Sequence, residues 1–355
     1  MAETYSGPLR YAVIEVTNRC NLRCPHCAST SGVARANELT LAEIREMLAT
    51  IADLGGEEIT VIGGEALMRD DWFEICRAVG DCGMKLLLIS NGLLIRTDEH
   101  FERLRRLRPW LIGVSVDGAR RETYRALRGV DGFDHVVALC KRLVAEGHRN
   151  VNAITTFWKP NLREFDGFVR LFENTGITWQ IQIANIGGER FDRRLFISRD
   201  DFAWLTAKMR DVFVNRRDSV HLRHMDDFGY FPLDPALRFL HQTWAGCIAG
   251  VELIGVRANG DVEGCLSLGD DFVEANLRRE PLREIWQSDR YFQRFRRKEE
   301  LLTGACARCP HASACRAGCT AIAYSATGGI GCNPYCIRAL ETEAILDDVT
   351  GAAEP

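Results

Sequence analysis

The sequence predicts an α/β protein in which a parallel sheet precedes a small cysteine-rich α+β unit, and three observations support this. Short apolar runs alternate with amphipathic segments along the first part of the 355 residues, as in chains built from βα units. Polar or glycine-rich segments follow several of these runs, where parallel βα folds collect their functional groups. Eight of the fourteen cysteines lie from Cys247 onward, so another kind of structure is expected there.

Each strand is predicted from an apolar or β-branched run, and each helix from apolar residues at helical spacing. The first helix begins at a capping box, Thr40 to Glu43, and stops at the glycine pair Gly55-Gly56. Six strands with their helices suggest an incomplete barrel of the (β/α)6 form. The expected strands are 11–16, 58–62, 85–89, 111–116, 150–156 and 179–183, and later helices are expected near 71–82, 98–107, 134–145, 162–174 and 200–216.

Composition excludes some classes of partner. The net charge of −4 gives no electrostatic reason to expect a nucleic-acid or membrane partner. The basic run from Arg290 to Lys298 is followed at once by Glu299 and Glu300, which favours a solvated helix face. No apolar run approaches membrane-spanning length and no signal peptide is present. Many cysteines without a secretory signal indicate metal ligation in a reducing compartment, so we expect a cytoplasmic protein.

Three cysteines follow the first predicted strand at the spacing C-x3-C-x2-C: Cys20, Cys24 and Cys27. A cubane iron–sulfur cluster has four irons held by thiolates, so three local thiolates leave one iron open. An open coordination position lets a metal centre bind a substrate or cosubstrate. The alternative is a zinc knuckle with His26 as the fourth ligand, although structural zinc sites usually present paired ligands in two separated halves.

This cysteine motif resembles that of the radical S-adenosylmethionine (radical SAM) superfamily. The resemblance implies that Cys20, Cys24 and Cys27 are the catalytic and metal-ligating residues of a 4Fe–4S cluster. It further implies that the open iron is chelated by the amino and carboxylate groups of S-adenosyl-L-methionine (SAM). One electron from the cluster would then produce a 5′-deoxyadenosyl radical, which abstracts a hydrogen atom from the substrate.

The segments after the next strands also resemble the family's SAM-binding set. Gly63-Gly64-Glu65 matches its GGE motif, whose backbone and carboxyl contact the amino group of SAM, although Ala66 stands where a proline is common. Ser115 matches a rim serine that reaches the ribose or carboxylate of SAM. An arginine on the following segment often pairs with that carboxylate, and we expect Arg128 rather than Arg125. The expected cofactor-binding residues are Gly63, Gly64, Glu65, Ser90, Asn91, Ser115, Asp117, Arg128 and Asn185, the last of which is alternatively a turn residue.

The C-terminal cysteines form a second pattern, which begins with Cys247-x12-Gly260-x4-Cys265 around a hairpin turn at Asn259-Gly260. It continues with Cys306-x2-Cys309-x5-Cys315-x3-Cys319, Cys332 and Cys336. Two zinc sites and two iron–sulfur clusters are equally compatible with thiolate ligands. The order resembles the SPASM extension of radical SAM enzymes, which implies two auxiliary 4Fe–4S clusters and three clusters in total.

The same resemblance divides the auxiliary ligands between an outer and an inner cluster. Cys306, Cys309, Cys315 and Cys336 would hold the outer one, and Cys247, Cys265 and Cys319 the inner one. Either Cys332 completes the inner set or its fourth iron is open. Cys76, Cys82 and Cys140 fall on predicted helices and are expected in the core. The expected units are a barrel at 8–218, a bridging segment at 219–243 and a SPASM domain at 244–345.

The resemblance leaves the substrate open. Many SPASM enzymes modify ribosomally made peptides, and others act on small metabolites. Leu266 stands where the sulfatase-maturating branch has an aspartate base, so formylglycine formation is not expected. The first strand begins about ten residues into the chain, and no fused leader-peptide domain is expected. A peptide substrate would therefore need a separate recognition protein or direct docking to the barrel.

Three hypotheses follow. The first is a peptide-modifying enzyme that forms a crosslink or oxidises a residue, since two auxiliary clusters could accept a second electron. The second is a dehydrogenase or epimerase of a small natural product or cofactor precursor, with Cys332 as the candidate hydrogen-atom donor of an epimerase. The third is a non-catalytic iron–sulfur or zinc-stabilised protein. In the first two, a flavodoxin or ferredoxin is the expected electron donor.

Overall fold

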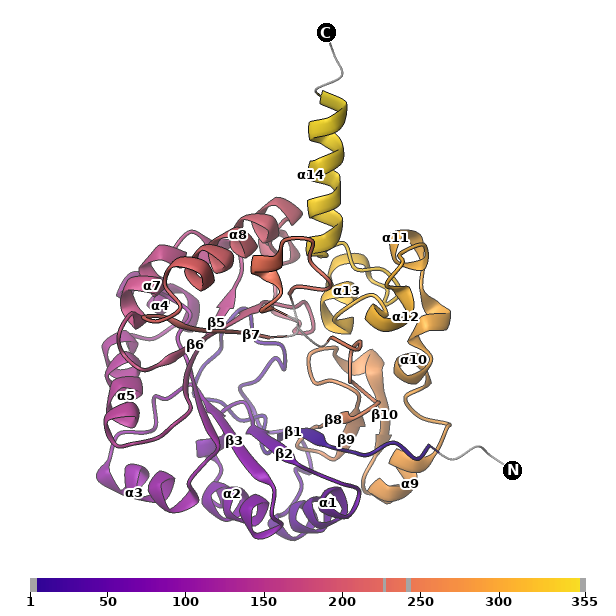
Figure 1. Cartoon of the computed structure of the whole chain (residues 1–355). Helices are drawn as coiled ribbons and strands as arrows, with labels where there is room; N and C mark the ends of the chain where they lie inside the picture. The colour runs from indigo at the N-terminus through magenta and orange to yellow at the C-terminus, as the bar shows by residue number, and fades with distance from the viewer. Residues whose placement is uncertain (1–4, 226–227, 241–243, 352–355) are drawn as a thin grey trace.

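A single ten-stranded sheet runs through the chain (Figure 1). The computed structural model describes residues 5–225, 228–240 and 244–351. The strands lie in the order β10-β9-β8-β1-β2-β3-β4-β5-β6-β7, and from β1 to β7 each is parallel to the next along the chain. They are β1 (Tyr11–Glu15), β2 (Glu58–Ile62), β3 (Lys85–Ser90), β4 (Leu111–Ser115), β5 (Val151–Phe157), β6 (Thr178–Ile183), β7 (His221–His224), β8 (Leu253–Val256), β9 (Asp261–Glu263) and β10 (Val273–Asn276).

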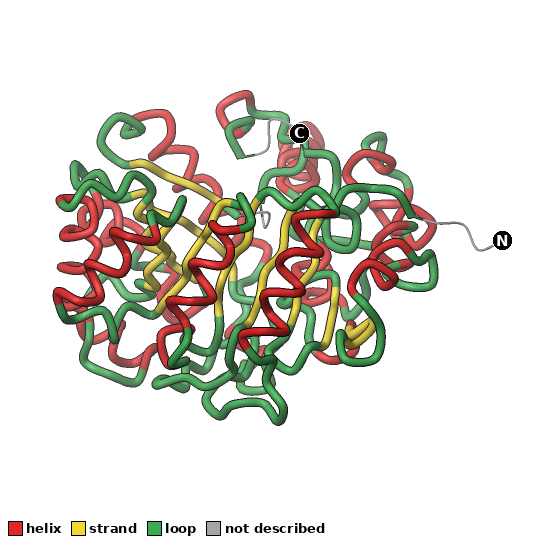
Figure 2. Tube along the Cα trace, turned by 90° about the horizontal axis from the view of Figure 1, so that it is seen from below, coloured by secondary structure: helices red, strands yellow, loops and turns green. Residues whose placement is uncertain are grey.

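The helices of the first part of the chain lie outside the curved sheet, as Figures 1 and 2 show from two directions. They are α1 (Leu41–Asp53), α2 (Trp72–Asp81), α3 (Asp98–Leu107), α4 (Arg121–Arg128), α5 (Phe133–Ala145), α6 (Lys159–Leu162), α7 (Phe165–Phe172) and α8 (Arg199–Asn215). The expected capping box forms at the start of α1, where Thr40 Oγ1 accepts from the Glu43 amide and the Glu43 carboxylate accepts from the Thr40 amide. Alternation of strand and helix therefore produces the incomplete barrel that the sequence predicts.

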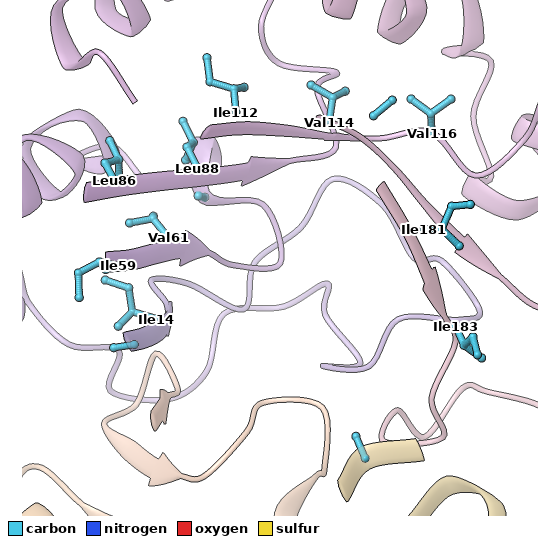
Figure 3. Close-up of a cluster of buried hydrophobic side chains, with 14 of the residues drawn as sticks. Ile14, Ile59, Val61, Leu86, Leu88, Ile112, Val114, Val116, Ile181 and Ile183 are labelled. Atoms are coloured by element: carbon cyan, nitrogen blue, oxygen red, sulfur yellow. The ribbon is translucent and has the colours of Figure 1, made fainter. Parts of the chain in front are cut away.

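The apolar layer between the strands and these helices holds the barrel together (Figure 3). Consecutive strands contribute aliphatic side chains to it, and each of those labelled in the figure is at most 4% exposed. Burial of an aliphatic side chain of this size contributes about 1.5–3 kcal/mol. The labelled members are Ile14, Ile59, Val61, Leu86, Leu88, Ile112, Val114, Val116, Ile181 and Ile183. Cys76 and Cys140 belong to the same core, as expected, and Cys82 is partly buried against it.

The C-terminal part continues the same sheet rather than starting a new one. Strand β8 pairs in parallel with β1, with Tyr11 opposite Leu253, and β9 turns back against β8 through the predicted Asn259-Gly260 hairpin. One sheet thus crosses the expected boundaries at 218 and 244, and those boundaries stay a prediction. Short helices pack beside this edge, and α14 projects away from the body (Figure 1). They are α9 (Leu282–Gln287), α10 (Gln293–Arg296), α11 (Gly304–Ala307), α12 (Ala312–Cys315), α13 (Thr320–Thr327) and α14 (Ile337–Gly351).

No helix in the described part of the chain is both long and apolar enough to cross a membrane. Three elements differ from the prediction. Helix α4 was not expected because only Tyr124 and Leu127 of its residues are buried, so its sequence lacks an apolar stripe. Strand β7 falls in the expected bridging segment because its residues, His-Leu-Arg-His, lack strand character. The helix expected at 162–174 is found as the shorter α7, which the four-residue α6 precedes, with Arg163 and Glu164 between them.

Candidate active site

The three cysteines of the C-x3-C-x2-C motif lie on one loop at the carboxyl end of β1. This loop follows the strand that pairs with β2 on one side and β8 on the other. Cys20, Cys24 and Cys27 line a cavity of about 250 Å³ together with residues from the ends of the next three strands. Parallel topology brings these strand ends to one rim, which is why segments far apart in sequence meet there.

Two glycines let the loop after β2 pack directly on the start of the cysteine loop. A Cβ added at Gly64 would lie 2.5 Å from the Arg19 carbonyl oxygen, and one at Gly63 would lie 2.8 Å from that of Thr17. The Gly64 amide donates to the Thr17 carbonyl at 2.6 Å, and the Glu65 amide donates to that of Arg19 at 2.9 Å. Any side chain at these positions would push the two loops apart, so their glycines are required by close backbone approach.

Glu65 turns its carboxylate inward instead of toward the cavity. It is 1% exposed, and it accepts hydrogen bonds from Ser90 Oγ at 2.8 Å and from the Asn91 amide at 2.7 Å. Burial raises the pKa of this carboxyl, and the donors from Asn91 and Ser90 oppose that rise. Glu65 therefore holds the turn after β3 in place. In that turn, Asn91 Nδ2 donates a hydrogen bond to Asn21 Oδ1 of the cysteine loop at 2.7 Å. The direct carboxyl contact with SAM expected from the GGE motif stays a prediction.

Asp117 forms a buried ion pair with Arg128 and also holds His26. Its Oδ2 lies 2.6 Å from Arg128 Nη2 and 2.7 Å from His26 Nε2, and its Oδ1 accepts from the Thr156 amide. Burial by itself would raise the pKa of Asp117, but Arg128 and His26 outweigh it and hold the pKa at about 2. The carboxylate is 0% exposed, so it supports the wall of the cavity from behind. The zinc alternative needs His26 as a ligand; its Nε2 is engaged by Asp117, and its buried Nδ1 has no hydrogen-bond partner.

Arg128 extends this support to the cysteine loop. It is the last residue of α4, which Gly129 ends in the left-handed conformation at φ 76°. Its Nη1 donates to Cys24 Sγ at 3.6 Å while its Nη2 is paired with Asp117. The missed helix α4 is thus what carries the expected arginine to the cavity. The sequence signal that could have revealed α4 is Gly129 directly after Arg125 and Arg128, since glycine commonly follows a helix with basic residues in its last turn.

The donor chemistry of the loop fits an iron–sulfur cluster. Burial raises the pKa of Cys20 to about 11 and also raises that of Cys24, so these thiols stay protonated until a metal displaces the proton. Backbone amides already point at the sulfurs, with Leu22 N 3.4 Å from Cys20 Sγ and Ser31 N 3.5 Å from Cys27 Sγ. Such N–H···S contacts are among the levers that tune protein-bound clusters. Within the described ranges, no three His, Cys, Asp or Glu side chains form a site for a single metal ion.

Seven of the nine expected cofactor-binding residues line this cavity, and Glu65 and Asp117 stand behind it. The lining members of the expected set are Gly63, Gly64, Ser90, Asn91, Ser115, Arg128 and Asn185. Six further polar side chains at the cavity were not expected as cofactor-binding residues: His26, Ser31, Thr156, Gln182, Arg190 and Ser267. Of these, His26 lies within the cysteine motif, and Ser31 and Ser267 lie within four residues of Cys27 and Cys265; the other three had no local signal. Asn185 also serves its own turn, accepting from the Gly187 amide at 3.2 Å.

A larger chamber of about 540 Å³ adjoins the cavity and shares Ala28 with it. The segment from Asn185 to Phe191 runs between the two, with Asn185 and Arg190 on the cavity and the intervening residues on the chamber. On its far side the chamber is lined by Leu266 and Leu268, which follow the β9 strand of the C-terminal hairpin. A substrate in the chamber would therefore lie between the cysteine loop and the C-terminal cysteines.

Gly188 is where this segment touches the cysteine loop, and it supplies a test. A Cβ at Gly188 would lie 1.9 Å from the Cys27 carbonyl oxygen. We expect Gly188→Ala to lower the free energy of unfolding by about 1–3 kcal/mol through overpacking, and to reduce the iron retained by the loop. Urea unfolding and iron analysis measure both. The matched control is Gly80→Ala in α2, where nothing lies within 4 Å and helix propensity predicts a gain of about 0.5–1 kcal/mol; equal behaviour of the two variants would contradict the contact.

The C-terminal cysteines gather in two places beyond the chamber. Cys306 and Cys315 each have Cys336 nearby, and burial raises their pKa values to about 11 and about 12. Burial likewise raises the pKa of Cys265 to about 12, with Cys247 as its thiol neighbour. Cys332 Sγ interacts with Cys306, so the spare thiol belongs with the outer group and its position does not favour completion of the inner one.

Lys298 is a buried cation beside the inner group, and it is the exception in a run whose Arg290, Arg294 and Arg297 are exposed as expected. It is 1% exposed, and its Nζ donates to the Gly318 carbonyl at 3.0 Å and to Thr320 Oγ1 at 2.9 Å. Burial lowers its pKa, and the thiols of Cys247 and Cys319 oppose that change. The Lys298 ammonium thus links the two residues that flank Cys319, Gly318 and Thr320, to the segment that carries Lys298.

Replacement of this lysine should be costly. We expect Lys298→Met to lower the free energy of unfolding by about 1–3 kcal/mol, because two buried acceptors lose their donor. Urea denaturation of the anaerobic protein measures the change. Lys141→Met on the exposed face of α5 is the control and should shift stability by less than about 0.5 kcal/mol. A Lys298 variant as stable as its control would show that the buried bonds are not needed.

Comparison with known proteins identifies the family. Residues 14–172 match the model of the radical SAM superfamily, and residues 247–310 match that of an iron–sulfur cluster-binding domain, SPASM. An AdoMet-dependent heme synthase of Methanosarcina barkeri is 32% identical over 338 residues, covering 91% of this chain and 95% of that protein. The chain therefore belongs to the radical SAM superfamily and carries a SPASM domain at its C-terminal side.

Further relatives have different named activities. The mycofactocin maturase MftC of Mycobacterium tuberculosis is 26% identical, over 91% of this chain and 82% of that one. Among solved structures, Streptococcus suis SuiB bound to its precursor peptide SuiA superposes with a TM-score of 0.73 at 18% identity, covering 93% of this chain and 75% of that one. The enzyme anSMEcpe with bound AdoMet also gives 0.73, at 16% identity and 94% and 95% coverage. These two structures confirm the fold of the barrel and its C-terminal extension.

Proposed function

We propose that the cavity beneath the cysteine loop binds SAM on a 4Fe–4S cluster held by Cys20, Cys24 and Cys27. The single observation that carries this proposal is the convergence of those three thiols with Gly63, Gly64, Ser90, Asn91 and Ser115 on one cavity. Bound there, cluster and SAM would supply a 5′-deoxyadenosyl radical that takes a hydrogen atom from the substrate. Arg128 offers its unpartnered buried Nε toward the carboxylate of SAM, while its Nη atoms position Cys24 and Asp117.

The surrounding residues would hold SAM by backbone approach and shape. Gly63 and Gly64 keep the β2 loop against the cysteine loop, so backbone groups rather than side chains face the amino group of SAM. Ser115 and Asn91 offer polar side chains at the rim, and Asn185 lies on the opposite wall. The closely packed walls would exclude water from a reactive radical, which protects it from side reactions.

The C-terminal cysteines would hold two auxiliary 4Fe–4S clusters, which gives three in the chain. We assign Cys306, Cys309, Cys315 and Cys336 to the outer cluster and Cys247, Cys265 and Cys319 to the inner one. Cys332 is a spare thiol of the outer group, which leaves one inner iron without a cysteine ligand. Held by these cysteines, the clusters would be suited to accept an electron from a substrate radical in the chamber. A flavodoxin or ferredoxin is the proposed reductant, and the proposed location is the cytoplasm.

The substrate we propose is a ribosomally made peptide that the chain crosslinks or oxidises. A mycofactocin maturase among the relatives and the precursor peptide bound to SuiB support this class. A separate leader-recognition protein would present the peptide to the chamber. The second candidate is a small cofactor precursor, and its specific support is the 32% identity with a heme synthase over nearly the full length of both chains.

The experiment is anaerobic reconstitution followed by incubation with SAM, a one-electron reductant and candidate substrates. We expect about twelve irons for three cubanes and formation of 5′-deoxyadenosine. Peptides encoded beside the gene and porphyrin precursors would be offered in parallel, with product mass as the readout. A mass change in a peptide supports the first candidate and a change in the porphyrin supports the second. Zinc without sulfide in the purified protein would overturn both.

A further inference from the structure

Arg190 is a partly buried cation at the cavity, and no carboxylate among the described residues pairs with it. Its Nη1 donates to the carbonyl oxygens of Ser31 at 2.9 Å and Thr30 at 3.4 Å. Its Nε and Nη2 are both buried and have no hydrogen-bond partner. An arginine fork of this kind pairs with planar carboxylates through two parallel bonds. The two free N–H groups are therefore set for a ligand.

The charge of the cavity wall points to an anion. Among the described residues that line it are two arginines and no aspartate or glutamate. The charge of Arg128 is balanced by the Asp117 carboxylate, whose Oδ2 lies 2.6 Å from Arg128 Nη2. Arg190 instead has only the carbonyl oxygens of Thr30 and Ser31 as partners. A desolvated charge without an opposite charge is unfavourable. An anionic group bound at Arg190 would offset that cost.

The position of Arg190 differs from that of most of the proposed SAM-binding set. Most of that set lies on the loops after β2, β3 and β4, whereas Arg190 follows β6, two strands beyond β4 in the sheet; Asn185 is the member of the set that shares its segment. Its segment forms the wall between the cavity and the larger chamber. The lining of the chamber is largely polar and charged, and its apolar members include Ile186, Phe191, Leu266 and Leu268. A ligand that reaches Arg190 from the chamber would thus carry an acidic end on a body of mixed polar and apolar character.

We propose that Arg190 binds a carboxylate of the substrate and so fixes the substrate next to the cysteine loop. This inference rests on the proposed function and narrows its substrate to molecules that carry a carboxylate. A peptide with an acidic side chain or a free C-terminus fits that description, and so does a small carboxylic acid. The carboxylate of SAM itself is the other source of the same chemistry, and the test separates the two.

The test is equilibrium dialysis of the anaerobically reconstituted holoprotein, saturated with SAM and kept without reductant. The probes are 3-phenylpropionate and its uncharged amide, 3-phenylpropionamide. We expect wild type to prefer the acid, Arg190→Gln to weaken acid binding at least about tenfold, and Arg190→Lys to lose less, because it keeps the charge without the fork. Arg194→Gln is the control, since that side chain is 89% exposed and paired with Asp192; it should bind the acid as wild type does.

The dissociation constant of SAM, measured on the same variants, distinguishes the sources. If the SAM dissociation constant of Arg190→Gln stays within about twofold of wild type while acid binding is lost, Arg190 binds a carboxylate of the substrate. Weakened SAM with unchanged acid binding, or equal binding of acid and amide, overturns the proposal. Dialysis involves no turnover, so a protein that prefers the acid but makes no 5′-deoxyadenosine on reduction would reject the proposed function and leave the Arg190 site standing. A protein that makes 5′-deoxyadenosine but does not bind the acid in preference to the amide would support the proposed function and reject the Arg190 site.

Discussion

The Cys24→Ala variant is expected to lose 5′-deoxyadenosine formation by at least about a thousandfold, since two thiolates do not hold a cubane that needs three. Cys24 is the most buried of the three cysteines and takes the N–H···S contact from Arg128 at 3.6 Å. The variant should also retain about four fewer irons per chain, while the auxiliary cysteines keep theirs. Chromatographic detection of 5′-deoxyadenosine and iron analysis measure the two effects together.

The matched control is Cys82→Ala. Cys82 is a partly buried cysteine at the C-terminal cap of α2 and belongs to none of the proposed cluster sets. Its replacement should therefore leave iron content and SAM cleavage at wild-type values. Cys309→Ala provides the complementary comparison: it should lower iron content yet keep some SAM cleavage, because its sulfur belongs to the C-terminal set. Full activity in Cys24→Ala would refute the assignment of the cysteine loop.

The second large effect is on stability, and it concerns the ion pair behind the cavity. Asp117→Asn should lower the free energy of unfolding by about 3–5 kcal/mol, because it leaves the buried guanidinium of Arg128 without its counter-charge. Asparagine can still accept from the Thr156 amide through one oxygen, so the loss reports the charge and the bond to His26 rather than the backbone contact. Urea unfolding of the anaerobic holoprotein is the measurement.

An exposed ion pair is the control for this change. Asp131 lies 3.1 Å from Arg121 with both side chains about half exposed, and Asp131→Asn should cost less than about 1 kcal/mol. The Asp117 variant should additionally lose iron from the cysteine loop, because Arg128 links Asp117 to Cys24. An equal loss of stability in the Asp117 and Asp131 variants would mean that water can take the place of the Asp117 charge and that the buried ion pair does not support the cavity.

Local patterns in the sequence predict most of the barrel, because its strands and helices carry strong periodicity. The helix 98–107 is found with the expected bounds, and the strand at 58–62 likewise. Helix α4 and strand β7 were missed for a common reason: both are polar segments that form because of where their neighbours place them. Tyr124 and Leu127 anchor α4 to the core, and the pairing of His221 with Thr178 makes β7 a strand.

Only those residues of the cavity that belong to a sequence motif could be predicted. The cysteines and the glycine pair identify the cysteine loop and its neighbours, and seven expected residues do line one cavity. The roles of Glu65 and Asp117 depend on which way a carboxylate turns, which no spacing reveals. His26 was considered only as a metal ligand, because its partner Asp117 lies 91 residues away. Arg190 had no signal at all, since its importance comes from two buried N–H groups that only the packed structure leaves unpaired.

The most direct test of an open iron at Cys20, Cys24 and Cys27 is electron–nuclear double resonance on the reduced holoprotein. The sample would be frozen with SAM carrying isotopic labels in its amino nitrogen and its carboxylate oxygens. We predict hyperfine coupling from both labels in wild type and from neither in Cys24→Ala. A wild-type spectrum that shows reduced cubanes but no coupling from either label would contradict the binding of SAM to an iron that the chain leaves bare.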